Sequence, residues 1–525
     1  MLSACVQKRS ILRVIKFNKY LFDVFVPDAN ISKSKIGLES PIRSFSAATA
    51  MGSKLLTIDS LNPCVKNVEY AVRGPIVQLA SKLEKELQQG IAKPFQDVVK
   101  ANIGDCHAVG QNPITFIRQV ISACTCPELI AQKVFPDDVN KRSSEILNAV
   151  KNSVGCYTDS QGIEFVRKSV AAYIEKRDGY PADPGNIFLT NGASSGVKLM
   201  LECFVSSEVK SGVMIPIPQY PLYSATISEY GLHQIGYYLN EEENWKLDIS
   251  ELKRSLEEAK KRCQPRVLCV INPGNPTGQV LSYQNIKEII EFCMDEGLFL
   301  LADEVYQDNT YGTESFHSFK KVLRDMGSKG DDFEMASFHS VSKGYMGECG
   351  IRGGYVEVIG LRDDVMVQLQ KLQSAQLCAN SIGQIVVDCI TNPPKPGDES
   401  YDLFMLEKTK VLESLKTRAK MVYEILNTIE GVTCNEVMGA MYAFPRVNLP
   451  KKAIAKAESV GERPDFFYCK NMLLETGLCV VPGSGFGQKD GTFHFRMTIL
   501  PPVEQIKSFL ERFKSFHLKF LETYS

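Results

Sequence analysis

The sequence predicts an α/β protein in which helices cover both faces of one mainly parallel β-sheet. Short, nearly continuous apolar runs, several rich in Val, Ile or Phe, recur between residues 187 and 358, as in strands buried on both faces. Stretches with apolar residues at helical spacing separate them, such as residues 282–296 (SYQNIKEIIEFCMDE). The seven predicted strands are 187–190, 213–216, 234–239, 266–271, 298–302, 335–338 and 354–358.

The C-terminal part of the chain predicts a smaller α/β domain. Apolar residues at three- and four-residue steps from Val503 to Phe520 describe a helix with one apolar face. We also expect a strand over residues 493–500, a helix over 403–429, and packing of the chain before about residue 115 against this domain. The expected segments are a leader (1–50), an N-terminal arm with part of the small domain (51–115), a large domain (116–395) and a C-terminal small domain (396–525), with a loop at 392–397 (NPPKPG).

The composition indicates a soluble enzyme or binding protein for small molecules. Hydrophobic residues make up 44% of the 525 residues and charged residues 23%, and the net charge of −1 gives no footprint for nucleic acid. No run of eighteen apolar residues is present, so a membrane-spanning helix is not expected. The 16 cysteines show no paired C-x-x-C spacing, which favours reduced thiols and argues against a metal site.

The first fifty residues differ from the rest. Five basic residues precede the first acidic one, Asp23, and serines and small residues follow at 43–50. A basic leader of this kind resembles a mitochondrial transit peptide, with a disordered tail as the alternative. Met51 offers a second start, so we expect a mitochondrial matrix protein and allow a cytosolic form.

Residues 337–354 (SFHSVSKGYMGECGIRGG) place Lys343 among small and glycine residues. Ser340 and Ser342 can donate hydrogen bonds to a phosphate, and Arg352 offers a planar fork that suits one. The chain lacks the G-x-x-x-x-G-K-[ST] pattern of a nucleotide-binding P-loop. The other common use of an amine beside a phosphate is a Schiff base to pyridoxal phosphate, while a solvated surface lysine is the alternative.

Asp303 follows the apolar strand 298–302, where a buried carboxylate needs a cationic partner. The protonated pyridine nitrogen of the same cofactor would supply that cation. Tyr306, and Asn275 in the loop NPGNPTG (272–278), can reach the ring oxygen of the cofactor. Taken singly, Asp303 could instead be a helix N-cap and the loop a structural turn.

The segment NGASSG (191–196) follows a predicted strand, and its backbone N–H groups and the hydroxyls of Ser194 and Ser195 form a phosphate cradle before a helix expected near Val197. Tyr220 follows another strand, where its ring can stack on a flat cofactor or pack in the core.

Arg496 lies on the face of its strand opposite Phe495 and Met497. An arginine in that place needs a carboxylate, either from a substrate or from a protein salt bridge.

The order of these motifs resembles the pyridoxal-phosphate-dependent aminotransferases of the aspartate-aminotransferase fold. Longer strings, over about residues 60–525, are similar to the alanine aminotransferases within that family. They include EYAVRGP (69–75), ANIGD (101–105), PITF (113–116), LLADEVYQD (300–308), SKGYMGECG (342–350) and VPGSGFG (481–487).

The resemblance implies a role for each matching residue. Lys343 would form the Schiff base and shuttle protons, Asp303 would contact the pyridine nitrogen, and Asn275 and Tyr306 the ring oxygen. Ala193, Ser194, Ser340, Ser342 and Arg352 would hold the phosphate, Tyr220 would stack, and Arg496, Asn275 and Gly104 would bind the substrate carboxylate. Tyr157 would reach the phosphate across a dimer interface, which implies a homodimer.

The implied reaction is reversible transfer of the amino group from L-alanine to 2-oxoglutarate by a ping-pong mechanism. The alternatives are a glutamate–glyoxylate aminotransferase and a non-catalytic ligand-binding module. In the aspartate branch of the family, one residue fewer separates the phosphate arginine from the lysine, so the loop that carries Arg352 is expected to bulge. For the distal carboxylate of glutamate the sequence offers only Arg73 as a candidate.

Overall fold

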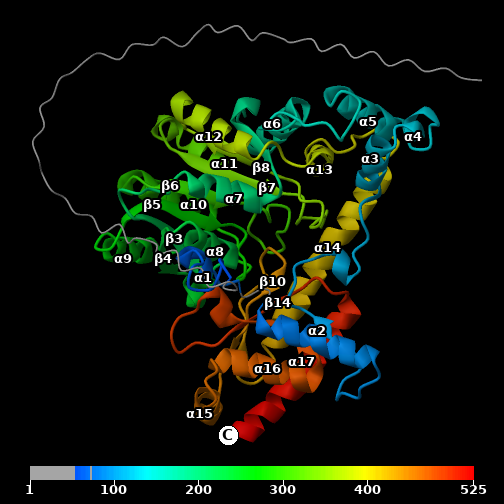
Figure 1. The fold of residues 1–525 in the computed structure, drawn as a ribbon. Helices are drawn as coiled ribbons and strands as arrows, with labels where there is room; N and C mark the ends of the chain where they lie inside the picture. The colour runs from blue at the N-terminus through cyan, green and yellow to red at the C-terminus, as the bar shows by residue number, and fades with distance from the viewer. Residues whose placement is uncertain (1–53, 71–73) are drawn as a thin grey trace, which may run out of the picture. The chain divides into compact units, whose positions relative to one another are not determined.

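The seven predicted strands form one sheet in the computed structural model, which describes residues 54–70 and 74–525 (Figure 1). The strands are β2 (Ile187–Thr190), β3 (Ser211–Ile217), β4 (His233–Tyr238), β5 (Gln264–Ile271), β6 (Phe299–Asp303), β7 (Met335–Ser340) and β8 (Gly354–Ile359). Their order is β2-β8-β7-β6-β5-β3-β4. Strand β8 runs antiparallel to both of its neighbours, β2 and β7, and the other pairs of this sheet are parallel. The predicted mainly parallel sheet is therefore confirmed.

Helices cover both faces of this sheet because successive strand residues point to opposite sides. In β2, Phe188 packs in one cluster with Val197 and Met200, whereas Ile187 and Leu189 pack in another. The first face is covered by α7 (Ala193–Glu202), α8 (Pro221–Glu229) and α12 (Asp363–Ala375). The second is covered by α6 (Glu164–Asp178), α9 (Ile249–Ala259), α10 (Tyr283–Glu296), α11 (Phe319–Asp325) and α13 (Ser381–Thr391). Helices α3 (Thr115–Thr125), α4 (Glu128–Ala131) and α5 (Asp137–Ala149) precede α6.

The central parallel strands end at one edge of the sheet. Ile271 of β5 lies opposite Asp303 of β6, and Asp303 lies opposite Phe338 of β7. The loops that follow these strands, including the one that carries Lys343, therefore leave the sheet side by side.

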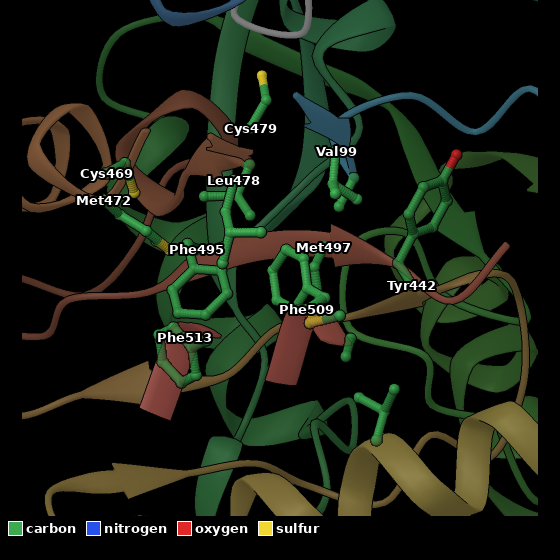
Figure 2. Close-up of a cluster of buried hydrophobic side chains, with 14 of the residues drawn as sticks. Val99, Tyr442, Cys469, Met472, Leu478, Cys479, Phe495, Met497, Phe509 and Phe513 are labelled. Atoms are coloured by element: carbon green, nitrogen blue, oxygen red, sulfur yellow. The ribbon is translucent and has the colours of Figure 1, made fainter. Parts of the chain in front are cut away.

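The C-terminal residues form a second core together with the chain before residue 110. This core contains Ile76 and Leu83 of α2 (Pro75–Gln88), and apolar residues of α14 (Tyr401–Leu426), α16 (Pro464–Thr476) and α17 (Val503–Tyr524). Figure 2 shows part of it, where Phe495 and Met497 meet Phe509 and Phe513. The other elements here are α1 (Pro63–Lys66), α15 (Lys451–Ser459), and the short strands β1 (Val99–Lys100), β9 (Val432–Thr433), β10 (Tyr442–Ala443), β11 (Arg446–Val447), β12 (Leu478–Cys479), β13 (Val481–Pro482) and β14 (Phe495–Thr498).

Several sequence-based bounds shift slightly. The helix expected near Val197 begins at Ala193, so Ser194 lies in its first turn rather than in the preceding loop. The strand expected over 493–500 spans Phe495–Thr498, between β10 and β13. The predicted leader and the candidate Arg73 lie outside the described residues.

No helix within the described ranges is long and apolar enough to cross a membrane. In the same part of the chain, no group of three or more His, Cys, Asp and Glu side chains is arranged to hold a metal ion. The described cysteines are free thiols.

Candidate active site

A cavity of about 650 Å³ lies at the strand-end edge of the sheet. It brings together residues that are hundreds of positions apart in the chain, and all but two of the described candidates from the sequence line it. These are Gly104, Ala193, Ser194, Tyr220, Asn275, Asp303, Tyr306, Ser340, Ser342, Lys343, Arg352 and Arg496. The exceptions are Ser195, whose hydroxyl donates to the carbonyl oxygen of Asn191 at 3.3 Å, and Tyr157, which is 81% exposed and lies outside the cavity lining.

Lys343 follows β7, and its ammonium points into the cavity. Lys343 Nζ donates a hydrogen bond to the carbonyl oxygen of Gly104 at 2.9 Å and lies 5.8 Å from the centre of the Tyr306 ring. Gly104 belongs to the N-terminal part of the chain, so the amine is held between that part and the sheet. A lysine that is anchored by one carbonyl has a fixed position but keeps its remaining hydrogens for other partners.

Asp303 is the last residue of β6 and is only 5% exposed. The hydroxyl of Tyr223 donates to Asp303 Oδ2 at 2.9 Å, and the backbone N–H of Val305 donates to Oδ1 at 3.4 Å. Burial raises the pKa of Asp303 to about 6, although these hydrogen bonds and the charge of Lys343 oppose the rise. Within the described chain no cation forms an ion pair with this carboxylate, so it is suited to a cationic ligand.

Arg352 lines the same cavity. Its Nη2 donates to Ser194 Oγ at 2.9 Å and to the carbonyl oxygen of Asn191 at 3.2 Å. Its backbone has φ of 60°, in the left-handed region that residues other than glycine seldom adopt. A Cβ at Gly192 would lie 2.4 Å from Arg352 Nη2, so only glycine leaves room for the guanidinium there.

The same corner offers further donors for an anion. The Ser342 hydroxyl is buried and has no hydrogen-bond partner within the described residues. Ala193 and Ser194 begin α7, where backbone N–H groups of the first turn are unpaired within the helix. A guanidinium, hydroxyls and a helix N-terminus together suit a phosphate group.

Arg496 is 1% exposed and lies between two aromatic rings. Its guanidinium carbon is 4.2 Å from the centre of the Tyr442 ring and 4.7 Å from that of Phe486. Nη1 donates to Asn275 Oδ1 at 3.2 Å and Nη2 to the carbonyl oxygen of Asn102 at 2.7 Å.

The Nε of this guanidinium is buried without a hydrogen-bond partner, and no carboxylate of residues 54–70 or 74–525 pairs with Arg496. A buried cation without a counter-ion is costly. Among the described residues Arg496 therefore has no protein salt bridge, which was the alternative that the sequence left open. Its guanidinium can bind a ligand carboxylate instead.

Three tyrosines of the site were not predicted from the sequence. Tyr223 holds Asp303, Tyr70 shares a hydrogen bond of 2.9 Å with Tyr220 through their hydroxyls, and Tyr442 lines the cavity beside Arg496. Tyr223 lies three residues after Tyr220, so helical spacing could have suggested it. Tyr442 has no local motif, because it enters the site from a short strand of the second core.

The family model for aminotransferase class I and II matches residues 130–513. "Alanine aminotransferase 2-like" of Danio rerio is 55% identical over 525 residues, covering 95% of this chain and 95% of its own length. "Probable alanine aminotransferase, mitochondrial" of Dictyostelium discoideum is 50% identical over 483 residues, covering 90% of each chain. Among solved structures, an alanine aminotransferase from Pyrococcus furiosus superimposes with a TM-score of 0.69 at 24% identity, over 87% of this chain and 100% of its own. The resemblance and the fold predicted from the sequence are both confirmed.

Proposed function

Since the chain belongs to the class I and II aminotransferase family, we propose that it transfers the amino group of L-alanine to 2-oxoglutarate, giving pyruvate and L-glutamate. The observation that carries the proposal is Arg496, a buried guanidinium without a carboxylate partner in the described chain, in the same cavity as Lys343 and Asp303. The α-carboxylate of a substrate would supply the carboxylate partner that Arg496 lacks. The names of relatives that are 50–55% identical over most of the chain support alanine as the donor.

We propose pyridoxal 5'-phosphate as the cofactor because the donor set fits it. Ser194, Ser340, Ser342 and Arg352 would hold its phosphate, Asp303 its ring nitrogen, and Asn275 and Tyr306 its ring oxygen. The cofactor would supply a cationic ring that takes up electrons as the substrate loses its α-proton. The unpartnered hydroxyl of Ser342 and the ion-pair-free carboxylate of Asp303 support this assignment.

Lys343 is the base in this proposal. Its Nζ takes the α-proton from the substrate, holds it as an ammonium, and gives it back in a second transfer. The Gly104 carbonyl, which accepts from Nζ at 2.9 Å, keeps the amine close to the cavity during both transfers.

Asp303 must stay ionised to hold a cation. Burial raises its pKa to about 6, so the cofactor-free carboxyl is partly protonated in mildly acidic solution. A cation at the ring nitrogen would lower the pKa again, because the charged form of the carboxyl then has a partner. Tyr223, which donates to Oδ2 at 2.9 Å, fixes the direction in which the other oxygen points.

Arg496 would orient the substrate. Its contacts with Asn275 and Asn102 and the rings of Tyr442 and Phe486 prevent the guanidinium from rotating. A bidentate pair with the α-carboxylate would then place the α-carbon at a fixed distance from Lys343. Because Asn275 Oδ1 accepts from Arg496, the Nδ2 of the same amide is the group that can donate to a ligand.

The charges of the cavity support a preference for alanine over aspartate. The described cations that line it are Lys198, Lys343, Arg352 and Arg496, and Lys198 is already paired with Glu229 at 2.6 Å. After the amine, the phosphate and the α-carboxylate are assigned, none of these described cations remains for the β-carboxylate of aspartate. Burying a carboxylate without a cationic partner costs at least about 2 kcal/mol. The distal carboxylate of 2-oxoglutarate, one carbon further from the α-carbon, is left to Arg73, the candidate from the sequence.

The test is a steady-state comparison of L-alanine and L-aspartate with 2-oxoglutarate as acceptor and one enzyme preparation. We expect kcat/KM to favour alanine by at least about a hundredfold, or roughly 2.7 kcal/mol. Glyoxylate in place of 2-oxoglutarate tests the other acceptor. Equal or faster reaction of aspartate would refute the substrate assignment and leave the fold unaffected.

The remaining features of the proposal concern assembly and location. A homodimer in which Tyr157 reaches the partner's phosphate is supported by the exposure of its ring, 81% in the single chain. A mitochondrial location is supported by the basic leader and by the printed name of the Dictyostelium relative, and Met51 would start a cytosolic form. Sequencing the N-terminus of protein isolated from cells tests it. We also propose the boundaries 51–115, 116–395 and 396–525 for the arm and the two domains.

A further inference from the structure

Tyr442 carries a hydroxyl that its packing does not explain. The residue lies in β10, is 3% exposed, and its ring belongs to the second core. Figure 2 shows it at the margin of that cluster, with the hydroxyl pointing away from Phe495 and Phe513. A phenylalanine would fill the same volume, and a buried phenol normally has a polar partner.

The hydroxyl lies over Gly104, opposite Lys343. A Cβ at Gly104 would be 1.9 Å from Tyr442 Oη and 3.1 Å from Lys343 Nζ, so both atoms face the space that the missing side chain leaves. The carbonyl oxygen of the same glycine accepts from Nζ at 2.9 Å. Gly104 therefore brings the phenol and the ammonium together from different parts of the fold.

Within the described residues, few polar or titratable groups surround Tyr442 and Lys343. Arg496, Tyr306 and Cys349 face Tyr442. Lys343 faces Arg496, Cys349, Cys106 and the carboxylate of Asp303 as well as Tyr442.

These neighbours shift both groups towards the charged form. Burial alone would raise the pKa of Tyr442, but Lys343 and Arg496 outweigh it and the net pKa is lowered. Burial alone would lower the pKa of Lys343, but Tyr442 and the thiols of Cys349 and Cys106 outweigh it and the net pKa is raised. Opposite charges on the two groups stabilise each other.

We propose that Tyr442 is the proton-exchange partner of Lys343. The proton of Tyr442 Oη moves to Lys343 Nζ and leaves a phenolate facing an ammonium. It returns to Oη when Nζ must be a neutral base. Only the O–H and N–H bonds change, and the proton count of the pair is constant. The proposal rests on the role of Lys343 in the proposed function, and it makes Tyr442 a residue that acts through the lysine.

The first experiment measures the neutral fraction of Lys343 in the cofactor-free chain. Trace labelling with acetic anhydride over a range of pH, with the Lys343 peptide quantified by mass spectrometry, reports that fraction. Lys82, whose side chain is 72% exposed, serves as the internal reference. We expect Lys343 in Tyr442→Phe to be labelled at least about tenfold faster than in the wild type at the same pH, because its pKa falls when the anionic partner is removed.

The second experiment measures the ionisation of Tyr442. In a pH titration of the wild type, phenolate absorbance should show one step at lower pH than the ionisation of the other tyrosines. This step should be missing in Tyr442→Phe and should move to higher pH in Lys343→Met. The reciprocal shift is required because the coupling of two sites is the same from either side. The Lys343→Met arm keeps the test valid even if Tyr442→Phe disturbs folding.

Tyr311→Phe is the matched control, since this buried tyrosine donates to the carbonyl oxygen of Ala440 at 2.6 Å and does not line the cavity. It should leave the labelling of Lys343 unchanged. Identical labelling profiles in the wild type and Tyr442→Phe, or an unmoved phenolate step in Lys343→Met, would overturn the proposal. Both readouts use cofactor-free protein, so a wrong amino-acid substrate would not affect them.

Discussion

Replacing Asp303 by asparagine should stabilise the cofactor-free protein above about pH 6 while it weakens cofactor binding. The carboxyl is 5% exposed, and its ion-pair partner in the proposed complex is the cofactor rather than a residue of the chain. Asparagine has the same shape and can still accept the hydrogen bond from Tyr223. The substitution therefore removes a buried charge with little change in packing. Active sites often carry such a cost in stability.

The size of the effect follows from the pKa. Burial raises the pKa of Asp303 from 3.8 to about 6, and one unit corresponds to about 1.4 kcal/mol. The penalty above pH 6 is thus about 3 kcal/mol. Between about pH 4 and 6 the folded chain binds more protons at this site than the unfolded chain, so this site lowers stability as pH rises. The unfolding entropy of a chain of this length is about 1 kcal/mol/K, so the shift in Tm is about 3 °C.

The assay compares the Tm of cofactor-free wild type and Asp303→Asn from about pH 4 to about pH 8. The Tm of the variant should be similar at the acidic end and higher at the neutral end. Added cofactor should raise the Tm of the wild type more than that of the variant, because only the carboxylate gains a cationic partner.

Asp325→Asn is the control of opposite sign. Hydrogen bonds from Tyr180, Lys321 and Tyr283 outweigh burial and lower the pKa of Asp325, so the wild type gains stability at this site as pH rises. The Asp325→Asn variant should therefore become less stable than the wild type as pH rises. A Tm difference for Asp303→Asn that does not change with pH, or that falls towards neutral pH, would refute the reasoning.

Two further predictions concern the geometry of the cavity. Gly104→Ala should lower kcat/KM by at least about tenfold, because its Cβ would lie 1.9 Å from Tyr442 Oη. Gly350→Ala should cost much less, because its Cβ would have no neighbour within 4 Å among the described residues. Arg496→Lys should raise the KM for alanine and for glutamate by at least about tenfold, because an ammonium cannot make the bidentate pair, and steady-state kinetics with Arg446→Lys as the control would show whether the loss is specific.

The sequence predicted the strands better than the contacts between them. Buried parallel strands are continuous apolar runs, so their positions can be recognised locally. The start of α7 was missed because Ala193 and Ser194, flanked by glycines, look like a loop, although they form its first turn. Lys343 and Asp303 could be found because each follows a strand. Tyr442 could not, since its relation to Lys343 exists only after the second core packs against the sheet.

The arrangement also couples the two ends of the proposed substrate. Arg496 lies 4.2 Å from the ring of Tyr442, and its charge lowers the pKa of both Tyr442 and Lys343. A carboxylate bound to Arg496 neutralises that charge, so both pKa values rise. The phenol then holds its proton more firmly, and the ammonium is less opposed by the guanidinium. In the proposed mechanism, recognition of the carboxylate is therefore communicated to Tyr442 and Lys343 through electrostatics.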